Sequence, residues 1–416
     1  MLTSCTKSDI IRAIFFTGGG NLRRYLCIIL CLIIAISSLS LVSCNEKKSE
    51  ADEEKEIKKQ TEITDTETEP FDFDTISDIC ETKDNKYEVA FVCDIGSLKD
   101  LGYNQKIWEA TKKYASVHRK TYKYYALENA EKSTYTDRLN AMNDACKNGA
   151  KIVICAGSAQ GEAVVNSASA HPNVDFVWID GNVCTDKDGN ILQNVASLRF
   201  DEATSGYLAG YAAVSEGYTK LGFIGGGGGE NEACVKYGLG FLKGASAAAE
   251  KKGVDADVKF SFKYGSTYSP SAELQAMLNG WYTTGTEVIF CAGGKMCESC
   301  FEAAKSNDKF VIGVDVDQSP LSETVLTSAT KGLDTATESA LDIFYTGKWA
   351  SIGGKVTEFI YGGLPTENWK FRNFTLDDYK ALNTSFMSKS SLPTTPVNTA
   401  EYESETYNNL TVEYIK

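Results

Sequence analysis

The stretch Tyr87-Glu-Val-Ala-Phe-Val-Cys-Asp94 decides the fold class, because it is a short apolar run that ends in a carboxylate. Similar runs follow at 121–126, 151–155, 174–179, 194–198, 220–224, 258–262, 287–291 and 310–314. Amphipathic stretches separate them, such as 135–148, where Leu139, Met142 and Cys146 share one helical face. Strands that are apolar on both faces and alternate with helices predict parallel sheets covered on two sides. Nine such strands exceed one comfortable sheet, so we predict an α/β protein with two lobes.

Three of the predicted strands end in an aspartate: Asp94, Asp180 and Asp315. Ligands of open α/β sheets bind outside the carboxyl ends of the strands. A single aspartate there is equally typical of a turn or a helix cap. Three at the same kind of edge predict a polar ligand cleft. The loop 96–105, which follows the first strand, adds further polar and aromatic groups to this edge.

The composition excludes several function classes. The chain has 416 residues and a net charge of −14, which argues against a nucleic-acid surface, because phosphate binding needs clustered cations. Its two histidines are His118 and His171, so we expect neither histidine catalysis nor a multi-histidine metal site. We predict that the protein is not an enzyme and uses no cofactor or metal.

The first 44 residues have the pattern of a secretion signal. Arg23 and Arg24 precede an apolar run of twelve residues, 25–36, which is shorter than the ~20 residues of a membrane-spanning helix. The ending Leu41-Val-Ser-Cys44 resembles the lipobox of bacterial lipoproteins, which implies cleavage before Cys44 and a lipid on its thiol. An uncleaved anchor helix is the alternative. Residues 45–86 carry 15 acidic residues and 7 lysines, a net charge of −8, and we predict a disordered acidic tether there.

A series of motifs carries a family resemblance across roughly residues 87–365. In order, the matching stretches are Asp94-Ile-Gly-Ser-Leu-Lys-Asp-Leu-Gly-Tyr-Asn-Gln105, 171–180, 206–213, 221–226, 237–244, 292–294, 313–318 and 326–331. The body resembles the basic membrane protein (BMP) family of substrate-binding lipoproteins, the purine nucleoside receptors of ABC transporters. Several motifs in family order are far more specific than any one of them.

The resemblance implies a bilobed type I periplasmic-binding-protein fold, with two Rossmann-like parallel-sheet lobes and three hinge crossovers. The expected division is 87–199 plus 320–347 for the first lobe, 200–319 plus 348–380 for the second, and 381–416 for a C-terminal tail. Such a protein captures a nucleoside between closing lobes and delivers it to a permease and ATPase. We expect a monomer, anchored to the outer side of the cell membrane through Cys44.

The resemblance also implies a set of ligand contacts: Asp94, Asp100, Tyr103, Asn104, Asp180, Tyr237, Gly293, Asp315 and Lys331. Tyr103 and Tyr237 stand where the family usually has phenylalanines that sandwich the base. Asn104 and Asp180 would hydrogen-bond the base.

Asp315 would hold the ribose hydroxyls, with Lys331 beside it, and Asp94 or Asp100 would complete the polar wall. The tyrosines depart from the family pattern, since each hydroxyl adds a polar group that can alter ligand choice.

Two alternatives remain open from the residues. The nearer one is a protein of the same fold that binds riboflavin, a sugar or a signalling ligand. The more distant one is a thiol-redox surface lipoprotein that uses Cys297 and Cys300, whose spacing also matches half of a zinc site. The glycine run 225–229 lacks the Gly-Lys-Ser/Thr ending of a P-loop, so we interpret it as a flexible cleft loop. In the loosely ordered tail, 410–415 is a candidate edge strand.

Overall fold

A computed structural model describes residues 73, 76–80, 82–93, 95, 98–100, 102–127, 133–265, 268–359, 362–387 and 405–416. The predicted signal peptide with Cys44, most of the predicted tether, and Asp94 lie outside the described residues. All of the elements below belong to one compact unit, Asp72–Lys416. No helix among the described residues is long and apolar enough to cross a membrane.

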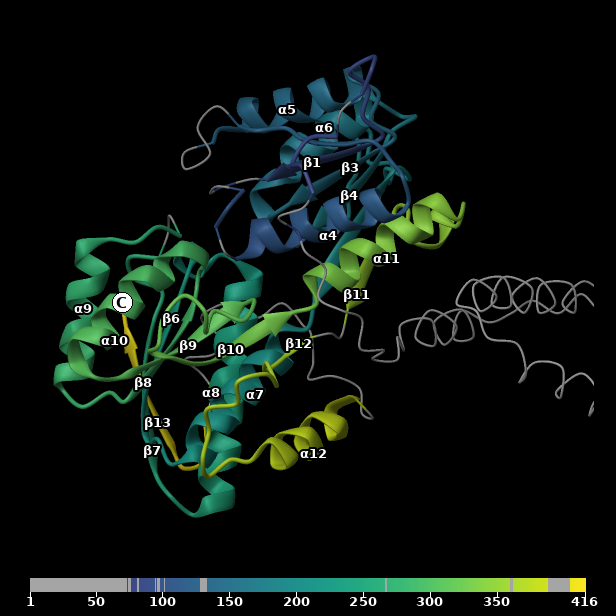
Figure 1. The fold of residues 1–416 in the computed structure, drawn as a ribbon. Coiled ribbons are helices and arrows are strands. Elements are labelled where there is room, and N and C mark those ends of the chain that lie inside the picture. The colour runs from purple at the N-terminus through teal and green to yellow at the C-terminus, as the bar shows by residue number, and fades with distance from the viewer. Residues whose placement is uncertain are drawn as a thin grey trace, which may run out of the picture. The chain divides into compact units, whose positions relative to one another are not determined.

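The first sheet has six strands, and every neighbouring pair in it is parallel. Its order is β11 (Val356–Phe359), β5 (Val195–Phe200), β4 (Asp175–Ile179), β3 (Ile152–Ala156), β1 (Val89–Cys93) and β2 (Tyr122–Tyr124). Its helices are α4 (Tyr103–Val117), α5 (Tyr135–Lys147), α6 (Gly161–Ala170) and α11 (Leu333–Tyr345). We call this sheet and its helices the first lobe (Figure 1).

Strand β1 explains why the apolar runs have no polar face. Val89 and Phe91 pack into a core with residues of α4 and α11, whereas Ala90 and Val92 pack into a second core with residues of α5 and α6. Successive side chains of a strand point to opposite faces, so a sheet covered on both sides needs apolar residues at every position. The predicted two-sided burial of this strand is confirmed.

The second sheet has seven strands. Its order is β12 (Gly362–Gly363), β10 (Val325–Lys331), β9 (Phe310–Asp315), β8 (Val288–Ala292), β6 (Lys220–Gly225), β7 (Ala256–Ser261) and β13 (Leu410–Ile415). Only β12 runs antiparallel to its neighbour among these described strands. Its helices are α7 (Glu202–Glu216), α8 (Glu232–Lys252), α9 (Ala272–Thr283), α10 (Cys297–Asn307) and α12 (Leu376–Met387). This sheet and its helices form the second lobe.

All nine predicted strands are present, and the predicted edge strand at 410–415 is confirmed as β13. Along the described chain, the path passes between the two sheets three times: after β5, after β10 and after β11. This topology confirms the α/β class with two parallel-sheet lobes and three crossovers.

The lobe boundaries need a correction at two strands. We expected 320–347 in the first lobe, but β10 pairs with β9 in the second sheet. We expected 348–380 in the second lobe, but β11 pairs in parallel with β5 in the first sheet. Strand β10 pairs with β9, the strand that precedes it in the chain, so the crossover comes later than residue 320. Strand β11 pairs with the distant β5, so its place is set by tertiary pairing.

The ordered body also begins before the expected boundary at residue 87. The backbone N–H of Cys80 donates to the carbonyl of Tyr122, and the ammonium of Lys112 lies 3.0 Å from a carboxylate oxygen of Asp78. The acidic segment therefore contacts α4 and β2 at its end, because Lys112 is buried there and needs a counterion.

Candidate functional site

Two of the strand-end aspartates stand at the carboxyl edges of the two sheets in the same unusual backbone conformation. Asp180 follows β4 with φ 59°, and Asp315 ends β9 with φ 66°. Positive φ is rare for residues with a Cβ, and aspartate tolerates it better than most. Such strained positions gather at functional sites, where the surrounding structure holds them.

Both aspartates face the ammonium of Lys331, the last residue of β10. Its Nζ lies 2.9 and 3.1 Å from the two carboxylate oxygens of Asp180 and 3.8 Å from Oδ1 of Asp315. A third carboxylate, Glu202 at the start of α7, lies 3.2 Å away. The side chains of Lys331 and Glu202 are each only 3% exposed. We call these four residues the Lys331 cluster.

Aromatic rings surround the same ammonium. Lys331 Nζ lies 5.4 Å from the ring centroid of Tyr103, 5.4 Å from that of Phe200 and 5.9 Å from that of Tyr237. The hydroxyl of Tyr237 donates to Oδ1 of Asp315 at 3.2 Å. The two predicted stacking residues therefore converge on one point, Tyr103 from the first lobe and Tyr237 from the second. The structure brings five predicted residues together here: Tyr103, Asp180, Tyr237, Asp315 and Lys331.

Burial shifts the acid–base properties of the Lys331 cluster. Burial raises the pKa of Glu202 to about 7, although the nearby Lys331 and Lys236 lower it. Burial likewise raises the pKa of Asp315 to about 6, against the lowering effect of Lys331. For Lys331, burial alone would lower the pKa, but the three carboxylates raise it above its ordinary value. Perturbed groups that converge in a cleft are typical of a functional site.

Helices α7 and α8 place the charged residues of the second lobe by an unusually close contact. A Cβ on Gly206 would lie 2.2 Å from the carbonyl oxygen of Tyr237, and one on Gly240 would lie 1.9 Å from that of Ala203. Gly210 and Gly244, one turn further along each helix, meet the partner backbone in the same way. Only glycines allow the two backbones to approach so closely. The contacts advance in the same direction along both helices, so the helices run parallel with both N-termini at one end.

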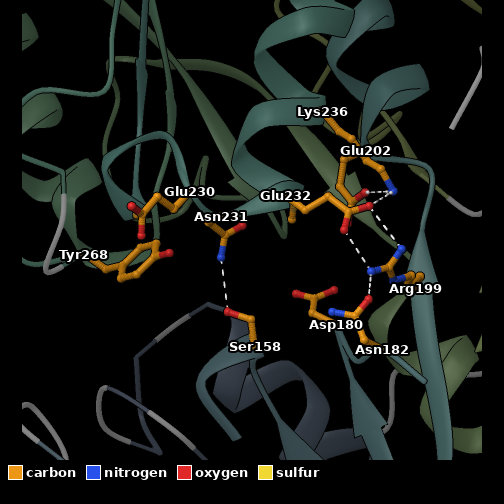
Figure 2. A pocket seen from close by; sticks show the side chains of 12 residues that line it. Ser158, Asp180, Asn182, Arg199, Glu202, Glu230, Asn231, Glu232, Lys236 and Tyr268 are labelled. Atoms are coloured by element: carbon orange, nitrogen blue, oxygen red, sulfur yellow. Dashed lines mark hydrogen bonds and ion pairs between the residues drawn. The ribbon is translucent and has the colours of Figure 1, made fainter. Parts of the chain in front are cut away.

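A cavity of about 370 Å³ opens beside the Lys331 cluster (Figure 2). It is lined by Ser158, Asp180, Asn182, Arg199, Glu202, Gly227, Glu230, Asn231, Glu232, Ala233, Lys236 and Tyr268. Arg199, Glu202 and Lys236 stand at one end, and Glu230 and Tyr268 stand at the other. Its size lies in the range of small-molecule sites.

Charges alternate along one end of this cavity. Lys236 Nζ lies 3.0 Å from Glu232 and 3.9 Å from Glu202. The guanidinium of Arg199 binds both carboxylate oxygens of Glu232, at 3.1 and 2.8 Å, and donates to the carbonyl of Gly181 at 2.9 Å. A continuous chain of ion pairs thus runs from the Lys331 cluster to β5 in the first lobe.

Among the described residues, three hydrogen-bonded or ion-paired contacts join the lobes across this region. They are Arg199 with Glu232, Lys331 with Asp180, and the side-chain amide of Asn231, which donates to the hydroxyl of Ser158 at 3.2 Å. Each pairs a residue near the carboxyl ends of the strands of the first sheet with one from the second lobe. A ligand held here would touch both lobes.

The remaining predicted residues have other surroundings. Asp100 accepts three hydrogen bonds from the backbone N–H groups of Gly102, Asn104 and Gln105, so its carboxylate caps the start of α4. Asn104 is buried, and its amide donates to the carbonyl of Ile95.

Its carbonyl oxygen Oδ1 is buried and has no hydrogen-bond partner among the residues that the structure describes. Gly293 lies in the loop after β8 and packs against Gly226 of the glycine run, outside the Lys331 cluster. Asp94 lies outside the described residues.

The sequence interpretation missed five charged residues that line the cavity: Arg199, Glu202, Glu230, Glu232 and Lys236. Two of them carried a usable signal. Glu202 precedes Gly206 and Gly210 at spacings of four, and Lys236 precedes Gly240 and Gly244 in the same way. In each helix the charged residue continues the row of glycines along one face. If that face is buried against another helix, the charge is buried as well and needs a partner.

The predicted thiol pair is buried. Cys297 is 1% exposed and Cys300 is fully buried, both at the start of α10, and Cys291 of β8 is beside them. Burial raises the pKa of Cys300, which keeps it protonated and works against thiol-redox chemistry. No group of three or more metal-ligating side chains occurs among the residues that the structure describes.

Comparison with known proteins gives a consistent family. Residues 87–359 match the Bmp family model, described as "ABC transporter substrate-binding protein PnrA-like". Basic membrane protein B of Borreliella burgdorferi is 24% identical over 331 residues, which are 78% of this chain and 91% of the relative. The CD4+ T-cell-stimulating antigen of Listeria monocytogenes is 27% identical over 243 residues, 56% of this chain; the match spans only 63% of that relative.

Solved structures share the fold. A solute-binding protein of an ABC transporter system from Aeropyrum pernix has a TM-score of 0.57 at 17% identity, covering 75% of this chain and 82% of the other. A transcriptional activator of the comK gene from Bacillus halodurans also has a TM-score of 0.57, at 20% identity, covering 74% and 99%. Identities this low establish the fold alone.

Proposed function

This chain belongs to the Bmp family of PnrA-like ABC transporter substrate-binding proteins, and from that premise we propose that it captures a nucleoside, with purines preferred, between its two lobes. The observation that carries the proposal is the convergence of Tyr103 and Tyr237 from opposite lobes on the Lys331 cluster. Aromatic rings can stack on the base, and carboxylates beside an ammonium can accept hydrogen bonds from the ribose hydroxyls.

The chemistry of a nucleoside matches this arrangement group by group. A base has two π faces, and stacking on aromatic side chains contributes roughly 1–3 kcal/mol per base in single-strand binders. A carboxylate such as Asp315 accepts hydrogen bonds from both hydroxyls of a ribose diol, and bonds to a charged acceptor are strong. The orphan carbonyl oxygen of Asn104 offers an acceptor for an amino group on the base edge.

Capture requires the lobes to move. Tyr237 is 1% exposed and Lys331 is buried, so a ligand reaches them only when the lobes part at the three crossovers. A ligand that contacts both lobes favours the closed arrangement by its differential affinity for it. We propose that the protein acts outside the cytoplasm as a monomer, held at the membrane by lipid on Cys44, and delivers the nucleoside to an ABC permease.

The test is a thermal-shift and calorimetry panel of ribonucleosides, free bases, riboflavin and sugars on the purified chain. A true ligand at about a hundred times its Kd adds roughly 2.7 kcal/mol of stability. We expect a response to purine ribonucleosides and a weaker one to their 2′-deoxy and 3′-deoxy analogues, because each lacks a hydroxyl for Asp315. A response to riboflavin or sugars alone would refute the nucleoside assignment and leave the family intact.

A further inference from the structure

Glu202 is not one of the predicted ligand contacts, and it lies between two buried lysine side chains. One carboxylate oxygen lies 3.2 Å from Lys331 Nζ, and the other lies 3.9 Å from Lys236 Nζ. All three side chains are almost fully buried. The carboxylate therefore bridges two ammonium groups, one from β10 and one from α8. Glu202 and Lys236 both line the cavity (Figure 2).

The helix pair fixes this bridge rigidly. Glu202 stands one turn before Gly206 on α7, and Lys236 stands one turn before Gly240 on α8. The close backbone contacts at those glycines place Glu202 and Lys236 at the same end of the helix pair. Asp201 caps α7 by accepting from the N–H of Thr204 at 3.0 Å, so the first turn that carries Glu202 is also held.

The distances around Lys331 indicate that Glu202 replaces Asp315 as a close partner of the ammonium. Asp315 Oδ1 lies 3.8 Å from Lys331 Nζ, beyond hydrogen-bond distance, and accepts instead from the Tyr237 hydroxyl. With Glu202 as a counterion on the buried side, Lys331 does not need Asp315 as a close partner. A carboxylate not engaged by an ammonium keeps acceptor capacity for ligand hydroxyls.

We propose that Glu202 is a positioning residue of the binding site: it holds the Lys331 ammonium on its buried side, so that Asp315 can accept hydrogen bonds from ligand hydroxyl groups. The inference rests on the proposed capture of a nucleoside and assigns Glu202 no ligand contact of its own.

The charge on Glu202 depends on pH. The groups that face it are Lys331 from β10, Lys236 from α8 and Asp180 from the first lobe, besides the N-terminal N–H groups of α7. Burial is the largest cause that raises its pKa to about 7, so it gains a proton as the pH falls through neutrality. Lys331 then turns to Asp315 as a second counterion beside Asp180 and competes with the ligand. Affinity should therefore rise with pH through the titration of Glu202.

The test compares the full-length wild type with Glu202→Gln and Glu202→Asp by calorimetry with adenosine and guanosine, from about pH 5.5 to about pH 8.5. We expect the wild type to gain about tenfold in affinity across this range, a coupling of ordinary size. Glu202→Gln should bind about tenfold more weakly at the alkaline end and lack the step near neutrality, whereas Glu202→Asp should keep the step. Glu273→Gln, an exposed first-turn glutamate of α9, is the matched control. A Glu202→Gln profile that superimposes on the wild type would overturn the inference.

A second readout needs no ligand and separates the two proposals. In protein labelled with ¹³C at the glutamate carboxyl, the resonance missing from Glu202→Gln reports on Glu202. Lys331→Met should raise its apparent pKa, because a favourable charge is removed. If the wild type binds no nucleoside, the proposed function fails while this titration still decides the positioning role. An unchanged Glu202 titration in Lys331→Met overturns the inference whatever the ligand panel shows.

Discussion

The ammonium of Lys331, at the end of β10, donates to both carboxylate oxygens of Asp180, which follows β4 and stands 151 positions earlier in the chain. The two residues belong to different lobes, so the pair forms only when the sheet edges face each other. A buried charge pair costs desolvation energy, and removing one partner leaves the other charge uncompensated.

Replacing Lys331 with methionine should therefore destabilise the fold by about 3–5 kcal/mol near neutral pH, because three carboxylates would lose their shared cation. The loss should shrink at about pH 5, where Glu202 and Asp315 take up protons. Urea unfolding at both pH values measures it. Lys187→Met, at an exposed lysine, should change stability little, and equal stability of the two variants at neutral pH would contradict the account.

Asp315→Asn should alter how stability depends on pH. The folded protein holds the proton on Asp315 up to a pKa of about 6, against an ordinary value of 3.8. Between these values the folded state binds more protons than the unfolded state, so the wild type loses stability as the pH rises through this window. The asparagine variant lacks this term. Its stability relative to the wild type should grow from about pH 4 to about pH 6 and then level off.

Asp137→Asn supplies a control of opposite sign for that measurement. Hydrogen bonds from Thr134 lower the pKa of Asp137 at the start of α5, so its carboxylate contributes stability that appears as the pH rises. The asparagine variant at this position should fall behind the wild type as the pH rises through the ordinary aspartate range. Denaturation curves of the two variants that move in the same direction would refute the assignment for Asp315.

Gly240→Ala should destabilise the second lobe, because its Cβ would lie 1.9 Å from the carbonyl oxygen of Ala203. Overpacking of this kind costs about 1–3 kcal/mol or more, and here backbone must move. Gly280→Ala in α9 is the matched control, since nothing lies within 4 Å of its added Cβ. It should stabilise the protein by about 0.5–1 kcal/mol. Thermal unfolding of both variants checks the pair, and a neutral Gly240→Ala would show that α7 and α8 can separate.

Arg199→Met should speed ligand release, because its guanidinium joins β5 to both carboxylate oxygens of Glu232 across the cavity. Both side chains are partly exposed, so we expect a loss of about 1 kcal/mol, or about fivefold in the dissociation rate. Stopped-flow displacement measures the rate. Arg138→Met on α5, where the arginine bonds within the first lobe to Ser133, should leave it unchanged. An unaltered rate in Arg199→Met would remove this ion pair from the closing contacts.

Local pattern was sufficient to predict most of the fold. Successive residues of β1 pack into two different cores, and a strand with no polar face is stable only where both of its faces are covered. The exceptions are β10 and β11: β10 pairs with β9 and stays in the second sheet, whereas β11 follows the crossover after β10 and pairs with the distant β5. Val356–Phe359 contains Thr357 and Glu358, so its pattern resembles an exposed loop until β5 supplies the neighbouring strand.

The sequence predicted some residues of the site but not others. Asp180 and Asp315 could be identified because a strand that ends in aspartate marks the ligand edge of a sheet. Glu202 differs from an ordinary first-turn glutamate only in its spacing from Gly206 and Gly210, and its role depends on the contact between α7 and α8. The cap made by Asp100 shows the converse, a residue expected in the ligand wall whose carboxylate is engaged by backbone N–H groups.

The glycine contacts between α7 and α8 also bear on the entropy of capture. Beside this contact, Glu202 and Lys236 are buried and ion-paired in the folded chain, so their rotamer freedom is restricted before any ligand arrives. Ordering a side chain at the moment of binding costs roughly 0.5–1.5 kcal/mol. The second lobe thus presents a preorganised half-site, and selection for new ligands can act on Tyr103, Glu230 and Tyr268 while the charged wall stays in place.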